Sequence, residues 1–298
     1  MVHINMPWRH LPHYLDLILE HRFNIEIGLG GVDLDTLSRT EARSMAEKLR
    51  KEGIRISLHG PFWDLCAGSQ DPFIRQVTRA RLQQLFDLVP VFDPVQVVCH
   101  TGYDPRHHGD WPRFLEVSLA TWEPLLERAE LLEVPLLLEN VWEYGPQLHH
   151  ALFSRLPSPY LGFCLDVGHQ HSFSRTSLLD WLEALADHLR EIHIHDNNGS
   201  SDAHLPVGQG TIDFDSLFQF VKERDREPLL TLEPHRESHL FESLGALTEV
   251  LERYGLLSEE QTHGHCGSQH RSPRTPHHES QPLCGPGSGG TAAKSATL

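Results

Sequence analysis

The chain has 298 residues, of which 39% are hydrophobic, so it is long enough for a sizeable core and is not wholly disordered. It carries 25 Lys and Arg against 41 Asp and Glu, and a formal net charge of −16 disfavours duplex nucleic acid as a partner. No run of 18 apolar residues is present, which argues against a membrane span, and the start MVHINMPWRH lacks the apolar segment of a secretory signal.

The cysteines point to a reducing compartment. There are 5 of them, widely spaced and without a CxxC pair, which argues against a disulfide framework and against a thiolate zinc site. We therefore expect a cytoplasmic protein.

Short apolar runs alternate with amphipathic stretches along most of the chain. The predicted strands, nearly continuous in Val, Ile and Leu as in strands buried on both faces, are Val2–Asn5, Asn24–Gly28, Arg55–Leu58, Gln96–Cys99, Pro135–Leu138, Leu161–Leu165, Glu191–Ile194 and Leu229–Leu232. Helical periodicity is found over Leu11–Arg22, Arg39–Glu52, Asp71–Val89, Trp111–Leu132, Leu178–Arg190, Asp215–Arg224 and His239–Tyr254, and more weakly over Gly145–Leu156. This alternation is typical of an α/β protein.

Eight strand–helix units in this length predict a single-domain (β/α)₈ TIM barrel over residues 1–257. The alternative is an open, doubly wound sheet. Gly28-Leu29-Gly30 resembles the start of a phosphate-binding turn, but Asp33 stands where the third glycine belongs, so we interpret these glycines as a loop. Residues 258–298 are rich in Gly, Ser, Pro and His and predict a disordered, low-complexity tail.

Six of the predicted strands end in side chains that can bind metal ions. In chain order these side chains are His59, His100, Glu139, Asp166 with the nearby His169, His193 with His195, and Glu233. The carboxyl ends of the strands of a parallel barrel open on one face, so these groups would meet in one pocket. No Lys lies near these strand ends, and buried carboxylates need positive partners. Histidine and carboxylate without thiolate suit Zn²⁺ or Mn²⁺, and we favour Zn²⁺.

The motifs around these positions follow a characteristic order. They are His59-Gly60-Pro61-Phe62, Cys99-His100-Thr101-Gly102, Leu138-Glu139-Asn140, Leu165-Asp166-Val167-Gly168-His169, His193-Ile194-His195-Asp196-Asn197, Asp202-Ala203-His204-Leu205-Pro206, Gly208-Gln209-Gly210 and Leu232-Glu233-Pro234. With these motifs, about residues 2–255 resemble the xylose-isomerase-like barrel superfamily, which includes endonuclease IV and many sugar isomerases and epimerases.

The resemblance implies one of two kinds of metal site. A one-metal site of the epimerase type would use Glu139, Asp166, His193 and Glu233. The endonuclease IV type has further ligands, all present here: His59, His100, His169, Asp202 and His204. By that resemblance, up to three ions would be held by His59–His100–Glu139, by Glu139 as a bridge with Asp166, His193 and Glu233, and by His169–Asp202–His204. The loop 197–210 lacks the Arg that a one-metal site more often shows there.

Clustered divalent ions favour phosphoryl chemistry. The sequence therefore predicts a phosphoester hydrolase that uses a metal-activated hydroxide on a small phosphorylated substrate. A small phosphodiester is favoured, with the nucleotide loop of a cobamide as a candidate by resemblance. Glu139 and Glu233 are the catalytic candidates, with His195 and Asp196 as supporting groups. The alternatives are a divalent-metal-dependent sugar or sugar-phosphate isomerase or epimerase, a non-catalytic binding barrel and, disfavoured by the acidic body, an abasic-site endonuclease.

Overall fold

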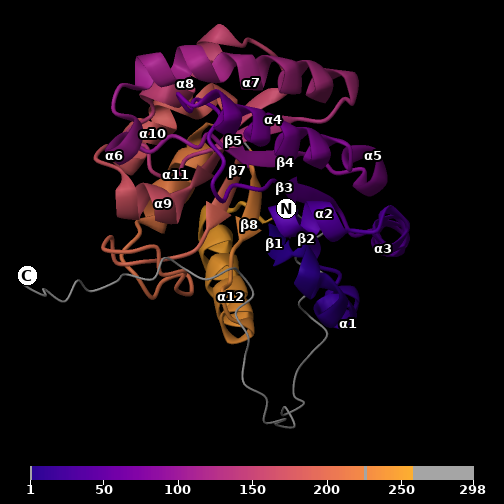
Figure 1. Ribbon diagram of the computed structural model, residues 1–298. Helices are drawn as coiled ribbons and strands as arrows, with labels where there is room; N and C mark the ends of the chain where they lie inside the picture. The colour runs from indigo at the N-terminus through magenta and orange to yellow at the C-terminus, as the bar shows by residue number, and fades with distance from the viewer. Residues whose placement is uncertain (1, 225–226, 258–298) are drawn as a thin grey trace, which may run out of the picture.

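A computed structural model describes residues 2–224 and 227–257, and the predicted tail at 258–298 lies outside the described residues. The strands form a closed barrel in which each strand runs parallel to its neighbours and β8 pairs with β1, with the helices outside (Figure 1). The strands are β1 (Val2–Pro7), β2 (Asn24–Gly28), β3 (Ile56–His59), β4 (Val97–His100), β5 (Leu136–Glu139), β6 (Leu161–Asp166), β7 (Leu189–Ile194) and β8 (Leu229–Leu232). The predicted TIM barrel is thus confirmed.

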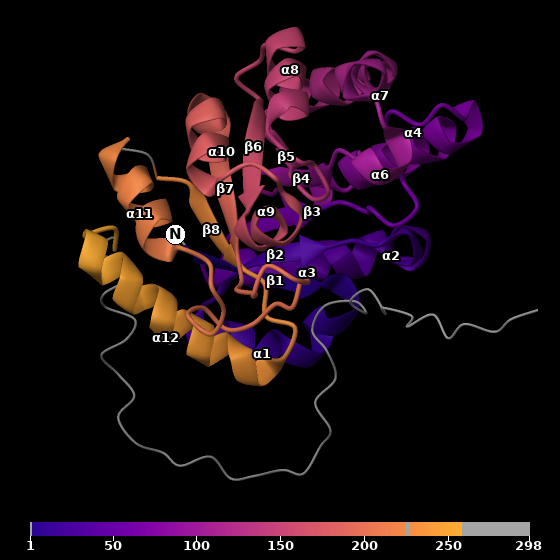
Figure 2. The same ribbon diagram turned by 90° about the vertical axis from the view of Figure 1, so that its left-hand side faces the viewer.

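The helices surround the barrel in both views (Figures 1 and 2). They are α1 (Leu11–His21), α2 (Gly31–Thr36), α3 (Arg39–Lys51), α4 (Pro72–Phe86), α5 (Val89–Phe92), α6 (Pro105–His108), α7 (Trp111–Leu131), α8 (Gln147–Arg155), α9 (Val167–Phe173), α10 (Leu178–Leu185), α11 (Phe214–Glu223) and α12 (Glu237–Tyr254), with short 3₁₀ turns at Trp8–His10 and Ala186–His188. Among the described residues, no helix is both long enough and apolar enough to cross a membrane.

Two predicted helices end earlier than their periodicity suggests. The helix expected to reach Val89 stops at Phe86, and a short helix restarts at Val89 with Pro90 in its first turn. Proline lacks the N–H that a continuing helix would need. The helix expected to reach Arg190 stops at Leu185, because Leu189 already pairs with Phe163 as the first residue of β7.

The strands are less uniformly apolar than expected, because their two faces differ. In β2, Ile25 and Ile27 belong to the main hydrophobic core, whereas Glu26 between them receives a hydrogen bond from Asn5 of β1. Side chains alternate across a strand, so the apolar residues face the helices and the polar ones face the barrel interior. Buried hydrogen bonds inside the barrel, such as Gln96 to Glu191, show the same pattern on other strands. The interior beneath the strand ends is therefore polar.

Candidate metal centre

The side chains predicted as metal ligands gather at the carboxyl ends of β3 to β8 and in the loop after β7. Glu139, Asp166 and His193 are almost fully buried, at 1%, 0% and 0% exposed. Asn140 ties two of the strand ends together, because its side chain donates to the Asp166 carbonyl and accepts from the Asp166 N–H, both at 2.9 Å. The barrel thus brings together groups that are far apart in the chain.

Glu139 lies at the centre of this cluster. Its Oε2 is 2.9 Å from His59 Nε2 and 3.0 Å from His100 Nε2. Its Oε1 faces a different pair of rings, at 3.2 Å from His169 Nδ1 and 3.5 Å from His193 Nδ1. Each oxygen of one carboxylate therefore has its own imidazole neighbours. His169 Nδ1 also lies 3.0 Å from the Asn140 carbonyl, so His193 is the ring that could share an ion with Oε1.

A second group surrounds His193 Nδ1. This atom lies 3.3 Å from Glu233 Oε1, 3.5 Å from Glu139 Oε1 and 3.9 Å from Asp166 Oδ2. The ligand atoms of Glu139, Asp166 and His193 all lie within 4.8 Å of one another, as do those of His59, His100 and Glu139. The predicted ligands of the first ion, and most of those of the second, are thus within reach of a shared cation.

The third predicted set is looser. Asp202 Oδ2 lies 3.2 Å from His204 Nε2 and 3.4 Å from His169 Nε2, so the carboxylate stands between the two rings. His204 adopts a left-handed backbone conformation with φ 45°, which costs a non-glycine residue roughly 1–2 kcal/mol. Such local strain is held in place by surrounding contacts and is often found at functional sites.

Asp196 holds the loop that carries Asp202 and His204. Its carboxylate accepts backbone N–H groups from Asn197, Gly208, Gly210 and Ile212, at 2.8 to 3.2 Å. Figure 2 shows this loop on the same side of the barrel as α9, consistent with the hydrogen bond from Asn197 to the Gly168 carbonyl. Asp196 therefore supports the site through the loop.

His195 supports the cluster more directly. Its Nε2 lies 3.2 Å from Asp166 Oδ1 and 3.6 Å from Asp202 Oδ1, so it sits between two carboxylates of the cluster. Its ring stacks on His204 with the centroids 3.7 Å apart, and His204 stacks in turn on His235 at 3.6 Å.

The histidine hydrogen bonds test whether these residues fit a metal ion. The Nδ1 atoms of His59, His169 and His204 lie 3.0 Å from the backbone carbonyls of Gly60, Asn140 and Glu233, which act as acceptors. With the proton on Nδ1, a neutral ring turns the lone pair of Nε2 toward a carboxylate oxygen. Two ligands of one tetrahedral ion lie roughly 3.4 Å apart. The Nε2-to-carboxylate distances of 2.9 to 3.4 Å are close to this value, so the residues fit divalent cations.

The pKa values of His59 and Glu139 are shifted by their contact with each other and with the neighbouring rings. Burial lowers the pKa of His59, but the Glu139 carboxylate outweighs it and raises the pKa to about 9. Burial also opposes the ionisation of Glu139, yet the His100 and His193 rings hold the pKa of its carboxyl well below the usual range. Both directions follow from the close contacts between the Glu139 carboxylate and the imidazoles around it.

Aromatic rings stand at the mouth of the site. Phe62 stacks on His100 with the centroids 4.5 Å apart, and Trp63 beside it is 63% exposed. In the loop after β5, Trp142 packs on Phe173 with the centroids 4.2 Å apart. Tyr103 is different, because it is buried and donates its hydroxyl to the Gly109 carbonyl at 2.6 Å.

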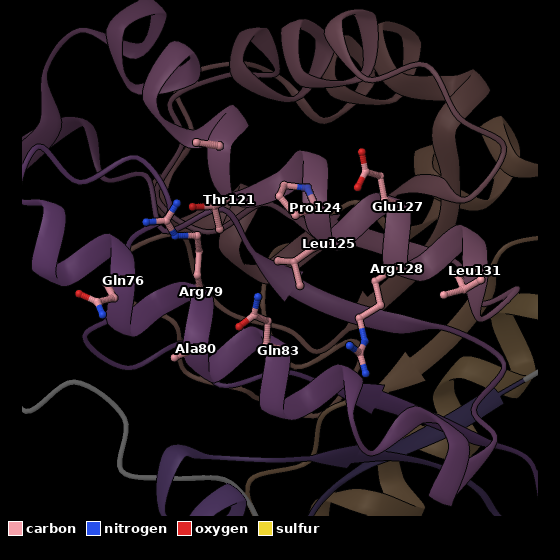
Figure 3. Close-up of a pocket in the computed structure, with 11 residues that line it drawn as sticks. Gln76, Arg79, Ala80, Gln83, Thr121, Pro124, Leu125, Glu127, Arg128 and Leu131 are labelled. Atoms are coloured by element: carbon pink, nitrogen blue, oxygen red, sulfur yellow. The ribbon is translucent and has the colours of Figure 1, made fainter.

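A separate groove of about 690 Å³ lies on the outside of the barrel between α4 and α7 (Figure 3). Gln76 and Arg79 of α4 face Thr121 and Arg128 of α7 across it. None of the candidate metal ligands lines this groove, so we place the site at the strand ends instead.

The comparisons with known proteins agree with this architecture. The sequence model of the family described as "Xylose isomerase-like TIM barrel" matches residues 24–254. The chain belongs to this family.

Relatives of this xylose isomerase-like barrel include an uncharacterized protein and a protein named as an epimerase. The chain is 26% identical over 247 residues to the uncharacterized protein MJ1311 of Methanocaldococcus jannaschii, covering 80% of this chain and 84% of that protein. It is 28% identical over 141 residues to fructoselysine 3-epimerase of Escherichia coli O157:H7, covering 45% and 49% of the two chains.

Solved structures show the same fold. A D-tagatose 3-epimerase-like protein superposes with a TM-score of 0.75 at 24% identity, over 85% of this chain and 98% of that one. The TTHB071 protein of Thermus thermophilus, described as soaked with ZnCl₂, superposes with a TM-score of 0.69 at 24% identity, over the same 85% and 98%.

Two buried carboxylates of this xylose isomerase-like barrel escaped the sequence analysis. Glu26 and Glu191 are both 0% exposed inside the barrel, and each lies close to His193. Glu26 has a signal in the sequence, because a charged residue between Ile25 and Ile27 in a predicted buried strand implies an inward-facing polar group. Glu191 follows Arg190 at the start of its predicted strand and has no such signal.

Gly168 is needed to leave room for His195. A Cβ at this position would lie 1.9 Å from His195 Cε1, so Gly168→Ala must push the ring away from Asp166. We expect a loss of about 1–3 kcal/mol of unfolding free energy, measured by denaturant titration. Gly245→Ala in α12 is the control, because its Cβ would meet no atom within 4 Å and alanine favours a helix. Equal stability of the two variants would contradict this packing.

Proposed function

We propose that this protein is a divalent-metal-dependent enzyme that hydrolyses a small phosphoester, a phosphodiester above all, with up to three ions at the strand ends. The observation that carries the proposal is the position of Glu139. Its Oε2 faces His59 and His100, whereas its Oε1 faces His169 and His193. A one-ion site with two Glu, one Asp and one His would need neither His59 nor His100.

The charges support several cations in one cluster. Glu139, Asp166, Asp202 and Glu233 converge here, and among the described residues no Arg or Lys forms an ion pair with any of them. Uncompensated buried carboxylates would cost several kcal/mol each. Zn²⁺ is favoured by the imidazole and carboxylate ligands, and Mn²⁺ fits the same donor atoms.

The chain's own residues divide the work. Bound divalent ions lower the pKa of a water and stabilise negative charge on the phosphate and on the leaving oxygen. Glu139 places one carboxylate oxygen beside His59 and His100 and the other beside His169 and His193. Glu233, at the open side of the cluster with its side chain 11% exposed, is placed to orient the attacking water and to accept its proton. His195 positions Asp166, and Asp196 positions the loop that carries Asp202 and His204.

The mouth of the site suits a small ligand with a flat apolar part. Phe62, which stacks on His100, and the adjacent Trp63 are 39% and 63% exposed. Burying this exposed aromatic surface under a ligand is favourable. The net charge of −16 gives no electrostatic footprint for a duplex.

Sugar isomerisation or epimerisation is the second candidate, and the names of the similar proteins favour it over hydrolysis. Fructoselysine 3-epimerase and the D-tagatose 3-epimerase-like protein are both named for sugar epimerisation. Glu139 of β5 and Glu233 of β8 both face His193 Nδ1, so two carboxylates are available to move a proton between adjacent carbons.

A side-by-side assay separates the two candidates. Metal-free protein is reloaded with Zn²⁺ or Mn²⁺ and tested with phosphodiesters, a cobamide included, and with ketoses and ketose phosphates. Hydrolysis predicts phosphoester cleavage that depends on more than one equivalent of metal. Ketose turnover at one equivalent, with no phosphoester cleavage, would overturn the hydrolase proposal in favour of the second candidate.

A further inference from the structure

We propose that Glu26 is a positioning residue that fixes the tautomer of His193, so that this histidine binds its ion through Nδ1. The inference rests on the proposed metal centre but not on the reaction that the centre performs. Glu26 lies on β2, away from the strand-end motifs, and belongs to none of the ligand sets inferred from the sequence.

The two nitrogens of His193 face different surroundings. Nδ1 faces the cluster, with Glu233, Glu139 and Asp166 at 3.3 to 3.9 Å. Nε2 points the other way, into the barrel, where Glu26 Oε1 lies at 3.4 Å. Neither ring nitrogen forms a hydrogen bond with the described residues, but Glu26 is the nearer of the two carboxylates beside Nε2. A proton on Nε2 would therefore have Glu26 as its nearest carboxylate acceptor, and the lone pair of Nδ1 would be left for an ion.

Glu26 is better suited to this role than the neighbouring Glu191. Glu191 Oε1 is 3.7 Å from His193 Nε2, but Glu191 already accepts hydrogen bonds from Gln96 at 2.6 Å and from Thr231 at 2.5 Å. Glu26 is held by Asn5, which donates to its Oε1 at 3.0 Å, and its Oε2 accepts no hydrogen bond from the described residues. A fully buried carboxylate with spare acceptor capacity beside a ligand histidine matches the carboxylate–histidine–metal arrangement.

His193 would then differ from the other ligand histidines in the ring nitrogen that binds the ion. His59, His169 and His204 each turn Nδ1 toward a backbone carbonyl and Nε2 toward a carboxylate of the cluster. His100 also faces Glu139 through Nε2. The geometry thus assigns the Nδ1-bound, Nε2-protonated form to His193 and the opposite form to His59, His169 and His204.

The first test measures zinc affinity without any substrate. The zinc affinity of the wild type, Glu26→Gln and Glu191→Gln is measured by competition with a chromophoric chelator. Each variant replaces one buried carboxylate of the same barrel with an isosteric amide. Loss of such a supporting partner typically weakens metal affinity by 10–100-fold, so we expect this range for Glu26→Gln and less than about threefold for Glu191→Gln. Equal effects of the two substitutions, or unchanged affinity in Glu26→Gln, would overturn the proposal.

The second test needs no variant and holds even if Glu26→Gln fails to fold. Nitrogen-15 spectra of histidine rings in the zinc-loaded wild type should show one ring with a metal on Nδ1 and a proton on Nε2. Spectra in which all the zinc-bound rings use Nε2 would overturn the proposal while leaving the hydrolase proposal intact. A wild type that binds no zinc in the first test would overturn both.

Discussion

Replacing Glu139 with Gln should remove more activity than any other single substitution in the site. The change takes the charge from a carboxylate whose two oxygens face His59 and His100 on one side and His169 and His193 on the other. Loss of one preorganised electrostatic group commonly costs 10²–10³-fold in turnover, and we expect on the order of 10³-fold or more because two of the proposed ions would share this ligand. Steady-state kinetics of zinc-loaded protein would measure the loss.

Glu143→Gln is the matched control for this prediction. Glu143 is another buried carboxylate close by in the chain, but it accepts hydrogen bonds from Thr101 and from the Val141 N–H rather than facing the ligand rings. Burial raises the pKa of its carboxyl to about 7, so loss of the charge should cost little. The amide oxygen of Gln can still accept from the Val141 N–H, and its NH₂ group can donate to the Thr101 hydroxyl. If Glu139→Gln kept as much activity as Glu143→Gln, Glu139 could not be the shared ligand.

Replacing His204 with Ala should strongly reduce phosphodiester cleavage while leaving ions bound near Glu139. His204 and Asp202 define the third set of ligands, and this set has no part in the one-metal epimerase site that the family resemblance implies. We expect a loss on the order of 10²-fold or more in turnover, together with one fewer zinc per chain. Full activity in this variant would exclude a role for the third ion.

His235→Ala controls for the packing of His204. The His235 ring stacks on His204 with the centroids 3.6 Å apart, yet it belongs to none of the proposed ligand sets. Its removal should leave the zinc content unchanged. A loss of zinc as large as that in His204→Ala would mean that stacking, and not ligation, accounts for the effect.

The barrel, and the meeting of the candidate ligands at its strand ends, could be predicted from the sequence because both depend on local patterns. Alternating strand and helix periodicity defines the strand–helix units. A polar residue directly after an apolar run, such as Glu139 or Asp166, marks the end of a strand. Once the strands are parallel and closed, their ends must share one face. The positions of His59, His100 and His193 then follow from the topology alone.

Contacts that depend on three-dimensional packing were not predictable in this way. Glu26 approaches His193 from a strand on another part of the barrel, and nothing in the local sequence indicates which interior group it would meet. The four amide contacts of Asp196 likewise depend on how the loop folds back, which glycines such as Gly210 permit. Helix ends differed where Pro90 or the pairing of Leu189 overrode the apolar period.

Zinc stoichiometry tests the proposed polynuclear centre most directly. The purified chain, stripped of metal and dialysed against limiting free Zn²⁺, would be analysed for zinc by mass spectrometry against its protein concentration. The ligand geometry around Glu139 and Asp202 predicts two or three tightly held zinc ions per chain. A single ion, unaffected by replacing His59 or His204 with Ala, would contradict it.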